Sequence, residues 1–279
     1  MRRVYILSMT AAFHSRDATP ADYERFAAFF GELGVEDPVP SRDAWCATMM
    51  PRTMFLERDG EAIGYAMIDV LAGTGYARHI VVAPTARRGG VGRALMAVIA
   101  AKLKSRGCTR WCLNVKEDNV AARTLYERVG MRTAYESVAF KFPWSAVDAL
   151  PRPASDVDVE FAAASDDAEI EARFDLPSGM LAGFRAMPGQ LLFALHDRVT
   201  RALAGFSRFA PGFPGSFPFR VARPDLARAL LDALRPHARP EHDWLMLTIE
   251  DDPELVRVIA ATGARVTMRL VHLRGEIGT

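Results

Sequence analysis

The chain carries the same order of secondary-structure signals twice, and this repetition limits its folds more than any other feature. In each half, two apolar runs about a turn precede a short strand, a helix, another strand and another helix. The matching stretches are residues 54–68 with 191–209, 81–96 with 219–234, and 111–133 with 244–266. Such self-similarity predicts two copies of one structural unit.

The two copies are separated by residues 142–158, a stretch with three prolines and no hydrophobic period. This composition is typical of a linker between domains. We place the boundary at Pro151, which gives domains of residues 1–150 and 151–279. A chain of 279 residues, half of them apolar, is long enough for two hydrophobic cores.

Composition excludes several classes of protein. The 35 basic and 34 acidic side chains leave a net charge of +1, so we expect neither a nucleic-acid partner nor a membrane surface. Cys46, Cys108 and Cys112 are too few and too irregular for a disulfide framework or a metal site, and we expect reduced thiols. Residues 1–9 begin basic and then apolar, but the apolar part is too short for a secretion signal or a membrane span. We therefore expect a soluble, cytoplasmic protein.

The first half predicts an α/β fold with a mixed sheet. Asp59-Gly60 between two β-rich runs indicates a hairpin, and Gly34, Gly107 and Gly130 each follow a helical pattern. The helical patterns cover residues 19–34, 91–107 and 119–130, and the strand patterns cover residues 53–70, 77–84, 110–115 and 134–142.

A cluster of arginines and glycines lies between the strand of residues 77–84 and the following helix. A helix N-terminus carries unpaired N–H groups and partial positive charge, and glycines let a phosphate approach the backbone closely. The segment has no Lys-Ser/Thr after its last glycine, so it is not a P-loop, and it lacks the later acidic residue of a Rossmann site. It therefore indicates a polyphosphate-binding loop, and the alternative is a flexible connection with solvated arginines.

Two motifs resemble those of the GNAT superfamily of N-acetyltransferases. Residues 80–96, IVVAPTARRGGVGRALM, are similar to the acetyl-CoA loop Arg/Gln-x-x-Gly-x-Gly/Ala, which Arg87, Gly90 and Gly92 fill. Residues 113–131 resemble the second signature, Leu-x-Val-x-x-x-Asn-x-x-Ala-x-x-Leu-Tyr-x-x-x-Gly-Phe/Met. The matching residues are Leu113, Val115, Asn119, Ala122, Leu125, Tyr126, Gly130 and Met131.

The resemblance implies two tandem GNAT-like domains, with acetyl-CoA as the co-substrate and no metal. It implies transfer of an acetyl group to a primary amine of a small molecule or peptide by direct attack in a ternary complex. Backbone groups of Ile80, Val81 and Val82 would pair with the pantetheine arm, and Asn119, an ordinary helix cap, would also contact the cofactor. The pyrophosphate loop would be Arg87, Arg88, Gly89, Gly90, Val91, Gly92 and Arg93.

The resemblance assigns Tyr126 as the acid that protonates the departing thiolate; the alternative is a core tyrosine. The acceptor amine must lose a proton before it attacks, and the base is open among three candidates. His79 has a suitable ordinary pKa but is also a common structural residue on a strand. Asp69 on the preceding strand and a bound water are the others.

The second copy is expected to keep the fold and to lack the chemistry. Its loop counterpart, VARPDLARAL, has no glycine, and Ile259 stands where the first copy has Tyr126. Two other functions remain as alternatives: a non-catalytic acyl-CoA sensor or partner-binding protein, favoured by the absence of a carboxylate on the strand of residues 77–84, and a nucleotide-binding module. The acceptor, the acyl-chain preference and the oligomeric state are left open.

Overall fold

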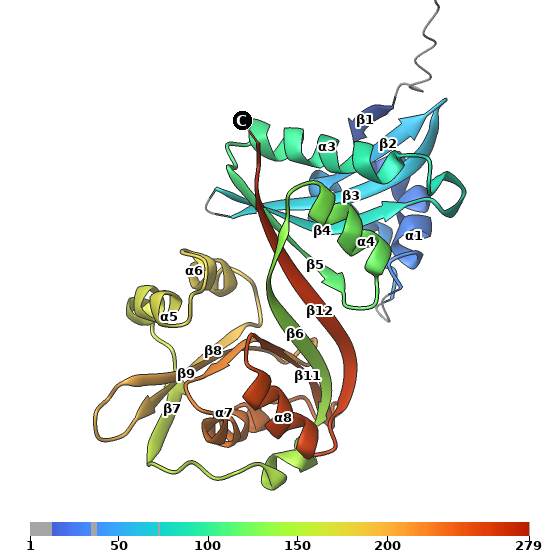
Figure 1. Cartoon of the computed structure of the whole chain (residues 1–279). Helices are drawn as coiled ribbons and strands as arrows, with labels where there is room; N and C mark the ends of the chain where they lie inside the picture. Colours follow the sequence, from blue (N-terminus) through green and yellow to red (C-terminus); the bar gives the residue numbers. More distant parts are fainter. Residues whose placement is uncertain (1–12, 35–37, 72, 279) are drawn as a thin grey trace, which may run out of the picture. The chain divides into compact units, whose positions relative to one another are not determined.

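The chain divides into two compact units in a computed structural model that describes residues 13–34, 38–71 and 73–278 (Figure 1). The first unit comprises residues 1–114, 120–132 and 273–279, and the second comprises residues 115–119 and 133–272. Residues 1–9, with their basic and then apolar pattern, lie outside the described residues.

The first unit is built on strands that follow chain order across the sheet. The strands are β1 (His14–Asp17), β2 (Thr53–Arg58), β3 (Glu61–Leu71), β4 (Thr74–Val82) and β5 (Arg110–Lys116). Neighbours from β1 to β4 are antiparallel, whereas β4 and β5 are parallel. Asp59 and Gly60 have φ values of 54° and 81°, which confirms the predicted hairpin between β2 and β3.

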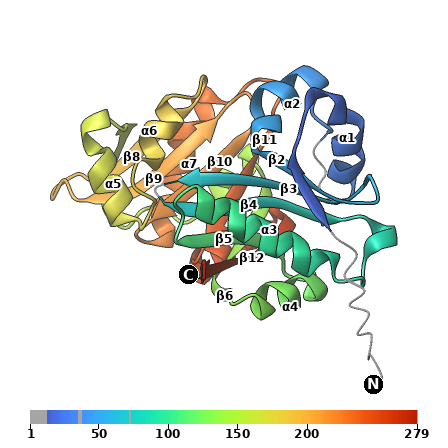
Figure 2. The same ribbon diagram turned by 90° about the horizontal axis from the view of Figure 1, so that it is seen from above.

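Helices cover both faces of this sheet. They are α1 (Tyr23–Gly31), α2 (Arg42–Thr48), α3 (Val91–Ser105) and α4 (Val120–Arg128). Phe55 and Tyr65 bury their rings against α1 and α2, whereas Leu56 and Gly64, next to them in sequence, face α3. A Cβ at Gly64 would lie 3.4 Å from Leu95 Cδ2, so its absence lets α3 lie close along the sheet (Figure 2).

The second unit repeats the order of the first. Its helices are α5 (Asp167–Arg173), α6 (Met180–Arg185), α7 (Ala227–Leu234) and α8 (Pro253–Ala261). Its strands are β6 (Arg132–Pro143), β7 (Val157–Phe161), β8 (Leu191–Asp197), β9 (Leu203–Ala210), β10 (Gly215–Val221), β11 (Trp244–Glu250) and β12 (Arg265–Glu276). Alternate residues of β8 join two separate apolar clusters, one with α7 and α8 and the other with α5 and α6.

The two halves of the sequence exchange their last strands. β6 comes from the first half, but it pairs antiparallel with β11 from Ser137–Glu250 to Pro143–Trp244. Conversely, the Ile277 N–H donates to the Thr109 carbonyl at 2.8 Å, and residues 273–279 belong to the first unit. The sequence predicted β6 as the last strand of its own half. The domain boundary at Pro151 stays a prediction.

The proline-rich segment is packed rather than extended. Trp144–Ala149 form a 3₁₀ turn, and Trp144, Val147 and Leu150 are buried in the core of the second unit. The Trp144 N–H also donates to the Asp243 carbonyl at 2.9 Å. These three large apolar side chains therefore anchor the segment in the core, although its prolines predicted a linker.

We expect Gly275→Val to destabilise the protein by about 1–3 kcal/mol through overpacking. A Cβ at Gly275 would lie 3.0 Å from Trp111 Nε1 and 3.3 Å from the Met131 backbone, so the clash is inside the first unit. Gly278→Val is the matched control, because a Cβ there meets nothing within 4 Å. Urea unfolding of both variants measures the difference; equal midpoints would contradict the packing of this segment.

Candidate active site

The pairing between β4 and β5 stops halfway along β4. The last partners are Ala77 and Leu113, and the next residue, Arg78, is a bulge because Met67 and Ile68 pair with His79 and Ala77. A bulge bends its strand and ends regular pairing. Residues 80–82 consequently continue the ladder with β3, while their other edge has no strand partner among the described residues.

The glycine-containing loop joins the end of β4 to α3. A 3₁₀ turn, Pro84–Ala86, leads to Arg88 and Gly90, whose φ values are +65° and +78°. The first backbone bond of the helix runs from the Ala94 N–H to the Gly90 carbonyl at 3.1 Å, and no side chain caps the helix. The N–H groups of residues 91–93 therefore have no acceptor within the helix and form a positively polarised end.

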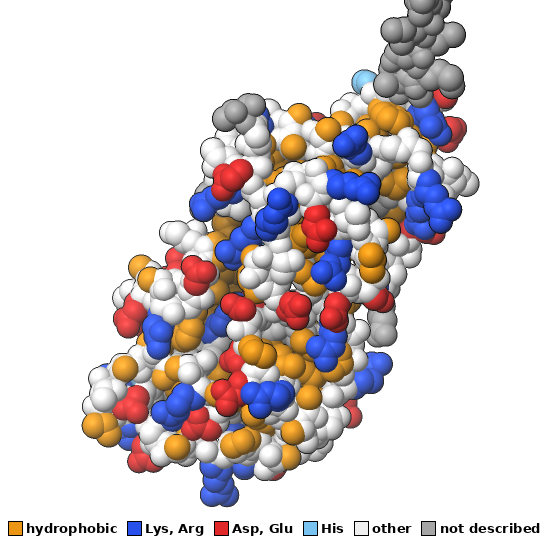
Figure 3. Space-filling model, in the orientation of Figure 1, with side chains coloured by type: hydrophobic (Ala, Val, Ile, Leu, Met, Phe, Trp, Pro, Cys, Tyr) orange, Lys and Arg blue, Asp and Glu red, His pale blue; other side chains and the backbone are white. Residues whose placement is uncertain are grey.

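The three arginines of the loop have different surroundings. Arg87 donates from Nε to the Val82 carbonyl at 3.1 Å and pairs with Glu32 at 2.8 Å, so it fastens the loop to β4 and to the end of α1. Arg88 and Arg93 form no ion pair with any described residue. Basic side chains are prominent on the part of the surface that carries α3 and α4 (Figure 3). Two of the three loop cations are thus available to an anion.

The glycines of the loop also differ. Gly90 needs its positive φ, and a Cβ there would meet no protein atom within 4 Å. A Cβ at Gly89 would be in ordinary contact with the Ala86 carbonyl, at 3.5 Å. A Cβ at Gly92, by contrast, would lie 3.0 Å from Leu125 Cδ2. Gly92 therefore permits close packing between α3 and α4, in addition to any role toward a ligand.

Tyr126 follows Leu125 on α4, next to the start of α3. Its side chain is 6% exposed, and its hydroxyl makes no hydrogen bond with a described residue. Burial raises the pKa of Tyr126 to about 12. The phenol is consequently protonated at neutral pH and has a proton to donate.

His79 lies in an aromatic environment. Its Nδ1 is 2.9 Å from the Tyr65 hydroxyl, and its ring meets Phe30 edge-on with centroids 5.8 Å apart. Burial, together with the positive charges of Arg78 and Arg52, lowers the pKa of His79 from 6.5 to about 4. The imidazole is therefore neutral and weakly basic at physiological pH.

Asp69 is held between two arginines. Its Oδ1 accepts from Arg52 Nη1 at 2.8 Å, and its Oδ2 accepts from Arg78 Nε. Burial alone would raise the pKa of this carboxyl, but the hydrogen bonds from Arg78 and Arg52 outweigh it and hold the pKa of Asp69 below its usual value. No local sequence pattern indicated that Arg52, Arg78 and Tyr65 would surround the two candidate bases.

Comparisons with known proteins agree with this geometry. The sequence profile of the Acetyltransferase (GNAT) family matches residues 21–131. The mycothiol acetyltransferase of Streptomyces avermitilis is 41% identical over 86 residues, which are 30% of this chain and 28% of that protein. A GCN5-related N-acetyltransferase structure from Sphaerobacter thermophilus is similar with a TM-score of 0.66 and 19% identity, covering 96% of each chain. A tandem GNAT protein from the clavulanic acid biosynthesis pathway gives 0.60 at 17% identity, over 96% of this chain and 99% of that one.

The chain carries a GNAT domain. The two solved structures cover nearly the whole chain, which confirms the tandem GNAT fold predicted from the repeated sequence. The segment shared with the mycothiol acetyltransferase spans less than a third of that protein's length.

The second GNAT-like copy keeps the strand geometry. β10 pairs with β9 through a register shift between Ser216 and Phe219, and its pairing with β11 ends at Ser216–Leu247. Pro218 lies within the shifted segment and has no N–H to donate to a ladder. The bulge and the early end of the parallel pairing therefore occur in both copies.

The start of the helix differs between the copies. Both copies have a 3₁₀ turn here, Pro84–Ala86 in the first and Pro224–Leu226 in the second. In the second copy the turn runs directly into α7, so the first N–H of the helix, that of Ala227, already donates to the Pro224 carbonyl, whereas residues 87–90 separate the turn from α3 in the first. Asp225 adds a negative charge in this turn and pairs with Arg223 at 3.1 Å. Ile259, at the position of Tyr126, is fully buried. The second copy therefore differs from the first in one backbone donor, in the carboxylate of the turn and in the residue at the position of Tyr126.

Among the residues with described placement, no group of three or more His, Cys, Asp or Glu side chains could hold a metal ion. No helix in the same part of the chain is long and apolar enough to cross a membrane.

Asn119 directly precedes α4, and its side chain is exposed.

We expect stability to fall as the pH drops from about 6.5 toward 4, partly because of His79. The unfolded state binds a proton at the ordinary pKa of 6.5, whereas the folded state binds it only near pH 4, so acid favours unfolding across this window. His79→Asn keeps an acceptor near Tyr65 and removes the titration. Urea unfolding at pH 7.5 and 4.5 should show a smaller loss for the variant; an equal loss would mean that His79 is not depressed.

Proposed function

We propose that this chain transfers an acetyl group from acetyl-CoA to a primary amine of a small molecule or peptide by direct attack in a ternary complex. The observation that carries the proposal is the junction of two features in one unit: an open helix N-terminus after β4 and an unpaired edge on β4 itself. The first suits a pyrophosphate, and the second suits an amide-containing arm. CoA contains both groups.

The cofactor contacts follow from this junction. The N–H groups of Val91, Gly92 and Arg93 hold the pyrophosphate, with charge from Arg88 and Arg93. Arg87 contributes mainly by fixing the loop, because its guanidinium is paired with Glu32. The backbone of residues 80–82 pairs with the pantetheine arm, and Asn119 lies at the start of the neighbouring helix.

Tyr126 protonates the thiolate as the thioester breaks. The role needs a phenol that is protonated at neutral pH and has a hydroxyl free of protein partners, and Tyr126 has both properties. The amine nitrogen forms the new bond to the acetyl carbon, the C–S bond breaks, and the sulfur takes the tyrosine proton. The tyrosine recovers its proton from solvent.

We assign removal of the amine proton to water rather than to a side chain. When the Tyr65 hydroxyl donates to His79 Nδ1, the neutral ring carries its proton on Nε2 and has no lone pair for the amine. Asp69 has its carboxylate oxygens occupied by Arg52 and Arg78, which lowers its basicity. Neither group is suited to accept a proton from an ammonium whose pKa is about 10.

The second copy acts in folding or in substrate selection and binds no CoA. The first N–H of its helix, that of Ala227, is bonded to Pro224, Asp225 adds a negative charge beside it, and Ile259 has no proton to give. A non-catalytic acyl-CoA sensor is the second candidate function, and the weakness of both side-chain bases favours it. The two functions differ in whether an amine causes release of free CoA thiol.

We expect Gly90→Ala to weaken CoA binding at least ten-fold, about 1.4 kcal/mol, because the new methyl group meets no protein atom and projects into the loop. Gly107→Ala is the matched control: it lies past the other end of α3, its φ is +80°, and its Cβ also meets nothing within 4 Å. Both variants carry the same backbone strain. Calorimetry should give one CoA per wild-type chain and full affinity for the control. Two sites, or equal loss in both variants, would contradict the proposal.

We expect Tyr126→Phe to lower turnover about 10²-fold or more and to leave CoA affinity nearly unchanged. The measurement is thiol release from acetyl-CoA with a panel of amines and peptides, alongside calorimetry with CoA. Wild-type turnover in the variant would remove Tyr126 from the mechanism. CoA binding without amine-dependent thiol release in the wild type would favour the sensor.

A further inference from the structure

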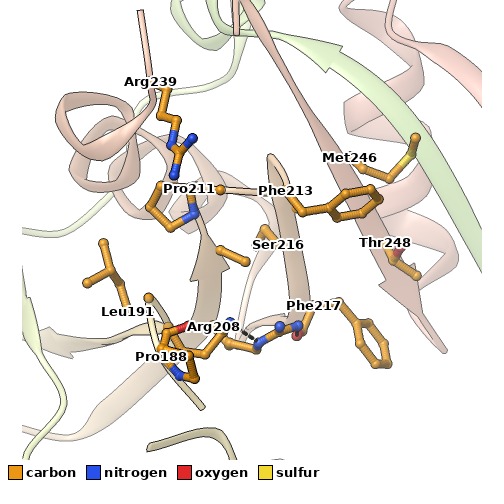
Figure 4. Close-up of a pocket in the computed structure, with 15 residues that line it drawn as sticks. Pro188, Leu191, Arg208, Pro211, Phe213, Ser216, Phe217, Arg239, Met246 and Thr248 are labelled. Atoms are coloured by element: carbon orange, nitrogen blue, oxygen red, sulfur yellow. Dashed lines mark hydrogen bonds between the residues drawn. The ribbon is translucent and has the colours of Figure 1, made fainter. Parts of the chain in front are cut away.

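The second unit contains a cavity of about 640 Å³ that the acetyl-transfer proposal does not use (Figure 4). It is formed by strands β9, β10 and β11, the segment before β8, and the loop that follows β9. All its lining residues belong to the second unit. A volume of this size is typical of sites for small organic molecules.

Arg208 on β9 is a partly buried cation in the cavity wall. Its Nε donates to Gln190 Oε1 at 2.7 Å and its Nη1 to the Phe217 carbonyl at 3.2 Å, while the Phe184 ring lies 4.8 Å from its guanidinium carbon. All of these partners are uncharged, and Arg208 forms no ion pair with any residue that the structure describes. Its Nη2 donors have no partner in the same set. A guanidinium removed from water without an anion is unfavourable unless a ligand supplies one.

The other residues that line the cavity are either positively charged, like Arg208, or uncharged. Arg239 is the second charged group, and it lies 3.8 Å from Glu241 in an exposed pair; no acidic residue lines the cavity. The Thr248 hydroxyl also lines it and has no hydrogen-bond partner among the described residues. Burial lowers the pKa of the Arg208 guanidinium, as expected for a cation whose charge has no nearby counterion.

The walls are otherwise apolar. Pro188, Leu191, Phe217 and Met246 surround the cavity, and Phe213 at its edge is 64% exposed (Figure 4). An exposed phenyl ring beside an apolar cavity offers surface that a ligand would cover. A guanidinium without an ionic partner, surrounded by apolar walls, is suited to a ligand with one carboxylate and an apolar body. The planar edge of Arg can donate hydrogen bonds to both carboxylate oxygens.

We propose that this cavity binds a small monocarboxylic acid with an aliphatic or aromatic body, with its carboxylate on Arg208 and its hydrocarbon part against Phe213, Phe217 and Met246. The inference is independent of acetyl transfer, because it uses no residue of the first unit. A phosphate or pyrophosphate is a poorer match. Only one guanidinium lacks an ionic partner, and the lining offers a dianion no open helix end.

The test is calorimetric titration of the full-length chain with phenylacetate and hexanoate, each paired with its neutral amide, and with inorganic phosphate. We expect one carboxylate per chain to bind at least ten-fold more tightly than its amide and than phosphate. Equal binding of acid and amide, tighter binding of phosphate, or no binding of either acid at millimolar concentration would overturn the proposal. These comparisons use the wild-type protein and do not depend on a variant that folds.

A pair of variants locates the site. Arg208→Met keeps an unbranched apolar stem and removes the charged guanidinium, and replacing a buried ion by an apolar group is compatible with folding. It should lose carboxylate binding at least ten-fold. Arg198→Met is the control, because Arg198 is exposed, pairs with Asp158 at 2.9 Å and does not line the cavity. Undiminished affinity in a folded Arg208→Met protein would place the ligand elsewhere.

Discussion

The early end of the β4–β5 ladder is the constraint on which the first unit's site depends. Parallel strands normally satisfy each other's backbone groups along their length, so a pair that separates leaves donors and acceptors that need another partner. The bulge at Arg78 causes the separation, since one extra residue on β4 breaks the register with β3 and bends the strand. The loop and α3 then begin where the strands are apart. The strand edge and the helix end consequently lie where the proposed ligand, which carries both amides and phosphates, would contact them.

The two copies show that this strand geometry is not sufficient. β10 repeats the bulge and leaves β11 after Ser216, yet its 3₁₀ turn runs directly into α7, so that the first of the helix N–H groups, that of Ala227, is already bonded. In the first copy, Arg88 and Gly90 adopt positive φ, which lets the chain enter α3 with those groups open. Asp225 adds a negative charge where a phosphate would otherwise lie. The positive φ angles of Arg88 and Gly90 therefore distinguish the proposed anion site from the helix start of the second copy.

Burial decides which titratable groups of the first unit can take part in chemistry. It raises the pKa of the Tyr126 phenol and keeps it a proton donor, whereas it lowers the pKa of His79 and weakens it as a base. Asp69 is buried too, but its two arginines stabilise the charged form, so it is unsuited to accept a proton for the opposite reason. Arg208 in the second unit follows the same rule: no described acidic side chain pairs with it, burial lowers the pKa of its guanidinium, and we propose that the carboxylate of a ligand binds beside it.

Local sequence signals determined the order of elements and predicted the loop that we propose binds the cofactor. The turn at Asp59-Gly60, the helix ends at Gly107 and Gly130, and the repeated pattern each depend on residues close in the chain, so a single sequence contains them. Only the tertiary structure showed the exchange of β6 and β12, because the apolar pattern of a strand does not specify which other strand pairs with it. It also decided the arginines around Asp69 and the apolar cavity at Arg208, which bring together residues distant in sequence. A side chain's charge and pKa depend on those neighbours, and only the folded chain supplies them.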